Sequence, residues 1–261
     1  MFFFWGVGLW LLSRAVGFPG ALLRFFFGYG IAYCCEWSSA RPGGWFPFGH
    51  YVYLPTTVHK EIWIGILPLM DSLSFDFLAV GALGLSGFIS GFSLGDTLRL
   101  PFRSFFPIFL RGVLMFVMID MVIDPVALRG DRWFLGRIYE YPDGGVYFGV
   151  TLANFAGWAV TGALVMASWR LCSLLPGFFS RSFVQERAGP PTPATGRELS
   201  RIVDRFGPLF VYGAVYLFNL AVAVRIEEWG IVLADLLLPA FFFFLFISSK
   251  SSGGSRSRER A

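Results

Sequence analysis

The sequence predicts an all-α protein, a polytopic transmembrane helical bundle of six to seven spans. Three observations predict this fold class. The 261-residue chain is 56% hydrophobic and 15% charged, and its mean hydropathy of +0.63 lies well above that of soluble globular domains. Several apolar stretches approach the roughly 20 residues that a helix needs to cross a bilayer. Segments rich in Pro, Gly and charge separate those stretches, as loops do in membrane proteins.

The first predicted span is residues 17–35, and an apolar run at 2–12 precedes it. That run is too short to span, so we expect an interfacial or partial segment there, on which the seventh span depends. Arg14 follows the run instead of preceding it, which argues against a cleaved signal peptide. The other predicted spans are 62–92, 104–123, 146–169, 206–224 and 231–247.

The spans predict a single transmembrane domain over residues 1–249. A polar linker at 170–205 separates the fourth and fifth spans, and its Pro, Gly and Thr content is typical of a flexible loop. The tail at 250–261 is basic and rich in Ser and Gly, so we expect it to be disordered.

Arginine and lysine predict the orientation in the cell membrane. The 170–205 linker and the tail are rich in these residues and lie two spans apart, so we expect both in the cytoplasm. The turn with Arg99 and Arg103 falls on the same side, and the loops at 36–60 and 124–146 then share the outer face. Because the arginines follow membrane orientation, the net charge of +4 does not indicate nucleic-acid binding.

Cysteine and histidine exclude two classes of site. Cys34 and Cys35 are adjacent and Cys172 stands alone, which is neither a disulfide framework nor a zinc spacing. His50 and His59 are the only histidines, too few for the membrane di-iron desaturases and hydroxylases. We therefore expect no metal site.

Asp120 and Asp124 are the first candidate catalytic residues. Their i,i+4 spacing places both carboxyls on one helix face, just before Pro125, where we expect the span to stop. Two carboxylates this close repel in a low dielectric, so one is expected to keep its proton. Only a protonated acid can protonate an unactivated alkene. In the alternative, the two residues close the helix end by pairing with arginines, namely Arg111, Arg129 or Arg132.

Two further acids are candidates. Asp71 lies in an otherwise apolar span, where a charge costs roughly 2.5–3.5 kcal/mol, and it is nearer the outer end than Asp76. The alternative for Asp76 is an ion pair with a buried arginine such as Arg111. Glu36 ends the first span and begins an aromatic loop.

The loop after Glu36 and the start of the 146–169 span supply candidate substrate-binding residues. Phe48 belongs to a tight apolar turn, and Tyr51 and Tyr53 project to the same side of an extended segment. An interfacial aromatic belt is the alternative for this loop. Asn154 is expected to face the bundle interior, where it binds water, holds a carboxyl or bridges two helices.

An aspartate pair also suggests a magnesium-dependent prenyltransferase, since acidic motifs hold the metal and the diphosphate in such enzymes. That chemistry needs a second acidic motif and basic groups. Asp71 and Asp76, five residues apart, make a poor second motif.

Four motifs follow one another along the chain and together cover most of residues 36–158. They are Glu36 with the PFGHYVY segment at 47–53, the GILPL run at 65–69, DMVIDPVA at 120–127 with Gly130 and Trp133, and GGVYFGVTLANFAGW at 144–158. Their order resembles a membrane family of carotenoid biosynthesis that includes the CruF-type carotenoid 1',2'-hydratases and bisanhydrobacterioruberin hydratase. The family commonly has a proline where this chain has Thr151.

The resemblance implies hydration of the ψ-end group of an acyclic or monocyclic C40 or C50 carotenoid. Water adds across the terminal 1,2 double bond and gives a tertiary alcohol, without a metal or redox cofactor. We expect Asp124 or Asp120 to protonate C-2, and Glu36 or Asn154 to orient the water that captures the cation at C-1. The aromatic faces expected to stabilise that cation are those of Trp133, Tyr147 and Trp158.

Membrane lipids and other enzymes of the pathway are the other expected partners. A carotenoid-binding or scaffolding membrane protein without catalysis is the third hypothesis. It predicts that the acidic residues can be replaced without loss of pathway output.

Overall fold

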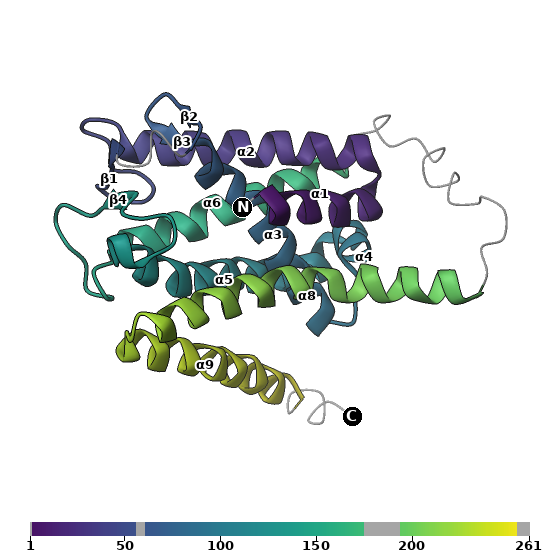
Figure 1. Cartoon of the computed structure of the whole chain (residues 1–261). Helices are drawn as coiled ribbons and strands as arrows, with labels where there is room; N and C mark the ends of the chain where they lie inside the picture. The colour runs from purple at the N-terminus through teal and green to yellow at the C-terminus, as the bar shows by residue number, and fades with distance from the viewer. Residues whose placement is uncertain (1, 56–60, 175–193, 255–261) are drawn as a thin grey trace.

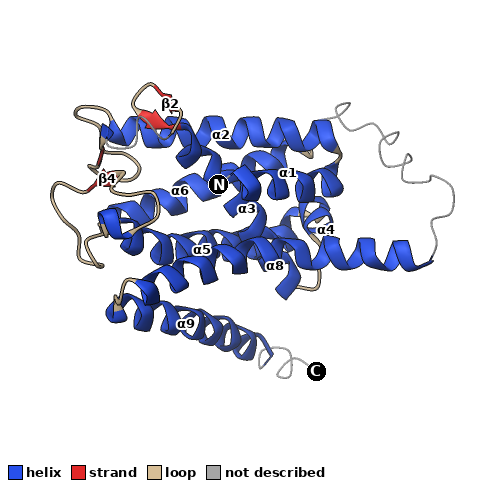
Figure 2. Ribbon diagram, in the orientation of Figure 1, coloured by secondary structure: helices blue, strands red, loops and turns tan. Residues whose placement is uncertain are grey.

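The structure, a computed structural model, describes residues 2–55, 61–174 and 194–254 of the chain (Figure 1). They form the all-α bundle that the hydropathy predicts, with short strands confined to the loops (Figure 2). The helices of this described part are α1 (Phe2–Val16), α2 (Phe18–Ala40), α3 (Leu69–Ile89), α4 (Leu94–Arg99), α5 (Phe102–Ala127), α6 (Leu152–Cys172), α8 (Ala194–Arg225) and α9 (Trp229–Gly254).

Five of the described helices are long and apolar enough to cross a membrane, namely α2, α3, α5, α6 and the Glu198–Arg225 part of α8. The protein is therefore a membrane protein. Helix α1 and the Trp229–Phe242 part of α9 are apolar but shorter, so the crossings that would raise the count to six or seven stay predictions. Helix α9 continues to Gly254, into the tail that we expected to be disordered, and residues 255–261 of that tail lie outside the described residues.

Helix α3 lies at the centre of the bundle and contacts α1, α2, α5, α6 and α8. Glycines on α3 let α8 pack closely against it. A Cβ at Gly84 would lie 2.3 Å from the Pro208 Cβ, and one at Gly81 would lie 3.2 Å from the Tyr212 Cβ. Small residues at a helix contact maximise dispersion between helices, which is the main packing force inside a bilayer.

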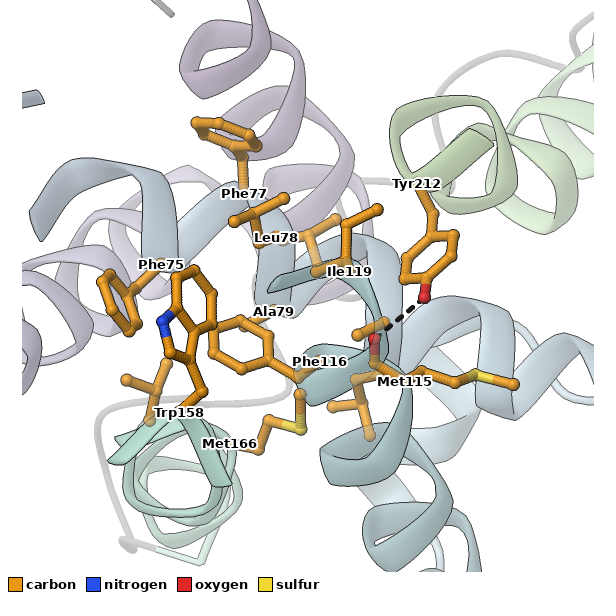
Figure 3. Close-up of a cluster of buried hydrophobic side chains, with 14 of the residues drawn as sticks. Phe75, Phe77, Leu78, Ala79, Met115, Phe116, Ile119, Trp158, Met166 and Tyr212 are labelled. Atoms are coloured by element: carbon orange, nitrogen blue, oxygen red, sulfur yellow. Dashed lines mark hydrogen bonds between the residues drawn. The ribbon is translucent and has the colours of Figure 1, made fainter. Parts of the chain in front are cut away.

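Aromatic side chains from several helices interlock in the core (Figure 3). Phe75 of α3 stacks on Trp158 of α6 with ring centroids 4.5 Å apart, and Phe116 of α5 lies 5.0 Å from the same indole. The Tyr212 hydroxyl of α8 donates to the Met115 carbonyl at 2.8 Å, so this phenol is satisfied although it is buried. Four helices are thereby fixed around one aromatic centre.

The span predicted at 62–92 begins later, at Leu69. The residues before it form a hairpin of β2 (Trp63–Ile64) and β3 (Leu67–Pro68), with Gly65 at positive φ in its turn. Pro68 occupies the position before the first helical residue, where its missing N–H costs nothing. As a result Asp71 lies in the first turn of α3 and not deep within a span.

Two other helix ends differ from the prediction. Helix α5 does not stop at Pro125 but runs to Ala127. A proline removes only its own N–H from the helix, and the Leu128 N–H again donates to the Asp124 carbonyl at 3.0 Å. Helix α6 begins at Leu152 and not at 146, because Phe148 and Gly149 both take positive φ in the preceding turn. The Thr151 hydroxyl caps α6 by accepting from the Asn154 N–H at 3.2 Å.

The linker predicted at 170–205 is partly helical. Helix α6 extends to Cys172 and α8 begins at Ala194, well before the predicted start of the fifth span at 206. Residues 175–193, the rest of the linker, lie outside the described residues. Its helical end is stabilised by a contact with α1, since the Arg14 Nε binds Asp204 Oδ1 at 2.6 Å.

The loops that follow α2 and α5 lie together, as predicted. Strand β1 (Val52–Tyr53) pairs antiparallel with β4 (Tyr139–Glu140), so that Tyr53 is opposite Tyr139. The side of the membrane that this end of the bundle faces stays a prediction.

Gly157 of α6 makes possible the contact between the first of these loops and the bundle. A Cβ at Gly157 would lie 2.7 Å from the Phe48 Cα and 2.3 Å from its ring. We expect Gly157→Ala to lower the free energy of unfolding by about 1–3 kcal/mol, because the backbone of the loop must move. The measurement is thermal unfolding in detergent. Gly30→Ala, where nothing lies within 4 Å, is the control, and equal stability of the two variants would contradict this packing.

Candidate functional site

A cavity of about 390 Å³ opens at the end of the bundle where β1 and β4 meet. Most of its lining is aromatic or aliphatic, and it includes side chains from α1, α2, α3, α5, α6 and α8. Three carboxyls line it, those of Glu36, Asp71 and Asp124. An apolar cavity with a few convergent polar groups is the usual form of a small-molecule site.

Asp124 receives hydrogen bonds from three side chains. The Tyr139 hydroxyl donates to Oδ1 at 2.7 Å, and the Tyr141 hydroxyl donates to Oδ2 at 2.8 Å. The Asn154 amide also donates to Oδ2 at 2.8 Å. Tyr139 and Tyr141 reach the same carboxyl because alternate residues of an extended segment point to one side. The arrangement stabilises negative charge on Asp124.

Asp120 lies one turn earlier on α5, fully buried behind Asp124. The Asn154 amide donates to its Oδ2 at 2.8 Å, so one amide bridges the two carboxyls that the i,i+4 spacing placed on one face. Within the described residues Asp120 Oδ1 has no hydrogen-bond partner, and Asp120 is not among the residues that line the cavity. Two anions held this close repel, so we expect the pair to keep one proton between them.

Glu36 and Asp71 form a second bridged pair. The Tyr53 hydroxyl donates to Glu36 Oε1 at 3.0 Å and also interacts with the Asp71 carboxyl. The Ser72 hydroxyl donates to Glu36 Oε2. Glu36 lies within α2, which continues to Ala40, and its side chain is buried. Helices α2 and α3 thus hold one pair of carboxyls at the cavity, and α5 holds the other.

Four tyrosines of the loops stand between these carboxyls, namely Tyr51, Tyr53, Tyr139 and Tyr141. Burial raises the pKa of each phenol well above its ordinary value, and the neighbouring carboxyls raise it further. All four therefore keep their protons near neutral pH. They act as fixed donors and not as acids.

The ion pairs considered for Asp120 and Asp124 are not what the described contacts show. Arg129 Nε lies 3.2 Å from a Glu228 carboxylate oxygen, and Arg132 pairs with the same carboxylate. Arg111 donates to the Ser90 hydroxyl at 3.0 Å. Arg129 and Arg132 therefore tie the loop after α5 to the turn before α9, and Arg111 ties α5 to the end of α3.

The cavity lining contains six of the seven substrate-binding residues that we predicted, namely Phe48, Tyr51, Tyr53, Trp133, Asn154 and Trp158. Tyr147, the seventh, is not part of the lining. It lies in the turn that a Tyr147–Val150 bridge closes, and its ring packs against Phe148 and Phe155. Asp76 also lies outside the lining, fully buried against Gly28, and in the described part of the chain its carboxyl has no hydrogen-bond partner.

Sequence reasoning missed Tyr139, Tyr141 and Ser72, which hold the carboxyls. One signal for the two tyrosines was present. The pattern Tyr-x-Tyr occurs at 51–53 and again at 139–141, in the two loops that we expected to lie together. Among the described residues no group of three or more His, Cys, Asp or Glu side chains is placed to hold a metal ion.

The chain matches the family model described as carotenoid biosynthesis protein over residues 1–183. The matched range includes all four carboxyls of the two bridged pairs, while α8 and α9 lie beyond it. Neither the curated proteins nor the solved structures gave a match. Because the matched range covers more than half of the 261 residues, the chain belongs to the carotenoid biosynthesis protein family, and its role is in carotenoid biosynthesis.

Proposed function

We propose that the protein is a carotenoid hydratase, which adds water across the terminal 1,2 (1',2') double bond of a ψ-end group. The observation that carries this proposal is the pairing of the carboxyls. Asp124 and Glu36, each bridged to a second acid, line one aromatic cavity. Addition of water to an alkene needs one group that gives a proton and one that takes a proton, and the two pairs supply both.

Asp124 is the proposed acid. It lines the cavity, whereas Asp120 lies behind it, so only Asp124 can reach the substrate directly. The proton that the pair holds passes to C-2, the π bond breaks, and a tertiary cation forms at C-1. The three donors on Asp124 then stabilise the carboxylate that remains, and they are in place before the reaction. Asp120 is a positioning residue that shares the proton through this pair.

Aromatic faces around the cavity stabilise the cation. Trp158, stacked on Phe75, and Trp133 line the space next to the carboxyls. A desolvated cation over an aromatic face gains about 2 kcal/mol, most of all over tryptophan. The same apolar walls limit the number of water molecules that reach the cation.

Glu36 is the proposed base. Water attacks C-1, the new C–O bond forms, and the proton released from the water passes to Glu36, which Tyr53 and Ser72 hold in place. The net reaction consumes one alkene and one water and involves no oxidation. Between turnovers the proton on Glu36 returns to the Asp120–Asp124 pair through solvent.

The two other hypotheses give different results in simple assays. A magnesium-dependent transferase would lose activity with a metal chelator, and the hydratase would not. A carotenoid-binding or scaffolding protein would tolerate replacement of Asp124 and Glu36 without loss of pathway output.

The size of the cavity suggests how a long substrate is held. At about 390 Å³ it lies near the lower end of the range for drug-sized ligands, so it fits an end group and not a whole carotenoid. The remaining polyene must leave through an opening. Two lining residues, Phe134 and Phe218, are 55% and 45% exposed, and their rings lie 5.1 Å apart in an edge-on contact. This pair marks the proposed opening towards the lipid.

A covalent link between Phe134 and Phe218 is expected to lower the turnover of a carotenoid at least about tenfold, because the polyene must pass between the two side chains. The variant is Phe134→Cys with Phe218→Cys, in a chain whose three natural cysteines are replaced by serine, treated with a short bifunctional thiol reagent. Each single cysteine variant, treated alike, is the control. Full activity of the cross-linked protein would place the opening elsewhere.

A further inference from the structure

A second cavity, of about 340 Å³, lies at the opposite end of the bundle from the first. It is formed by the last turns of α1, the segment around α4 and the first half of α8. Four arginines line it, namely Arg14, Arg99, Arg201 and Arg205, together with two acids, Asp96 and Asp204. The proposed reaction uses none of these residues.

Both acids of this cavity are engaged by neighbouring residues. Asp204 Oδ1 binds the Arg14 Nε at 2.6 Å. Asp96 Oδ2 accepts from the Ser93 hydroxyl at 2.6 Å and from the Ser93 N–H at 3.3 Å in a capping box. Four guanidinium groups against two carboxylates leave an excess of two positive charges.

Arg14 is paired with Asp204, so the excess positive charge comes from the other three arginines of the cavity. Arg99 donates to the Ala15 carbonyl at 2.8 Å, and the Arg205 guanidinium lies 5.5 Å from the Phe88 ring centre. Arg201 is exposed, and in the described part of the chain neither it nor the other two forms an ion pair. Several arginines around one cavity favour a tetrahedral oxyanion, since each guanidinium offers a fork of N–H donors to phosphate oxygens.

The surface beside the cavity is apolar. Leu199, Ile202 and Phe206 of α8 are exposed, in the same turns that carry Arg201 and Arg205. Charged groups beside an exposed apolar helix face are typical of the level at which lipid headgroups lie. A phosphate bound here could carry acyl chains that lie along this face of α8.

We propose that this cavity binds a phosphate group, from an anionic phospholipid headgroup or from soluble phosphate. Binding to the three arginines stabilises the contact of α1 and α4 with the first half of α8. The site is independent of the proposed hydratase reaction, so each can fail alone.

Native mass spectrometry of the whole protein tests the lipid source. The protein in detergent is mixed with phosphatidylglycerol and phosphatidylcholine in equal amounts. The detergent is then removed in the mass spectrometer, and the lipids that stay bound are counted. We expect one phosphatidylglycerol to be retained in preference to phosphatidylcholine. Charged contacts at a lipid surface contribute about fivefold per arginine, so replacing Arg99, Arg201 and Arg205 by glutamine is expected to weaken retention by on the order of a hundredfold.

Two further variants make the test specific. The control replaces Arg41, Arg103 and Arg225, three exposed arginines that do not line the cavity, by glutamine and removes the same charge. Arg201→Gln alone removes an exposed side chain from the cavity, so it cannot be confounded by misfolding, and about fivefold weaker binding is expected.

Inorganic phosphate in delipidated detergent solution tests the soluble source. A rise in the thermal unfolding temperature of the natural protein over that of the triple cavity variant, with chloride at equal ionic strength as reference, supports free phosphate as the ligand. If the natural protein and the triple cavity variant retain phosphatidylglycerol equally and respond equally to phosphate, the proposal is overturned.

Discussion

Replacing Asp124 by asparagine is expected to lower carotenoid hydration by about 10²–10⁴-fold, the usual contribution of a general acid. The amide cannot give a proton to C-2, although it has nearly the shape of the carboxyl. Tyr139 and Tyr141 can still donate to its oxygen, so the loop should stay in place. The measurement is turnover of an acyclic carotenoid by the purified protein in lipid or detergent, with the unfolding temperature recorded beside it.

Asp131→Asn is the matched control for this variant. Asp131 is an exposed acid in the loop that follows α5, and it does not line the cavity. The control should keep full activity. If Asp124→Asn also kept full turnover, the acid would be another residue and the assignment of Asp124 would be wrong.

Glu36→Gln is expected to lower hydration by about 10²–10³-fold, because glutamine cannot take the proton that the attacking water must lose. Ser72 and Tyr53 can still donate to its amide oxygen. Glu227→Gln, at an exposed residue outside the cavity, is the control and should leave turnover unchanged.

Isotope exchange distinguishes the roles of the two acids. In heavy water, Asp124 of the Glu36→Gln variant should still transfer deuterium to C-2 and take back a proton, so recovered substrate becomes labelled. The Asp124→Asn variant should show no label, because the first step itself is blocked. Labelled substrate from Asp124→Asn and none from Glu36→Gln would reverse the two assignments.

Hydropathy predicted the fold class and the approximate position of the five long apolar helices, because burial in lipid is a property of long segments. Helix ends were predicted less well, since they depend on single backbone groups. Pro68 marks the start of α3, whereas Pro125 does not end α5. The difference lies in the neighbouring backbone, where β3 occupies Leu67 and Pro68, directly before α3, and α5 still has a partner for the Leu128 N–H.

The candidate site was predictable where its residues share one helix. The spacing of Asp120 and Asp124 placed both on one face, and Asn154 was expected to face the interior of the bundle. The tyrosines were not predictable in the same way, because Tyr139 reaches Asp124 only when β4 pairs with β1, a contact between residues more than 80 apart in sequence. Tyr147 was expected to stabilise the cation, but it lies in the turn that the Tyr147–Val150 bridge closes and does not line the cavity.

The central claim is tested most directly by the pigments of a host that makes an acyclic carotenoid and expresses this chain. The account predicts a new carotenoid heavier than its precursor by the mass of one water, formed with the natural chain and with Asp131→Asn. It predicts none with Asp124→Asn. Unchanged pigments in a host whose membranes contain the folded natural chain would contradict the hydratase proposal.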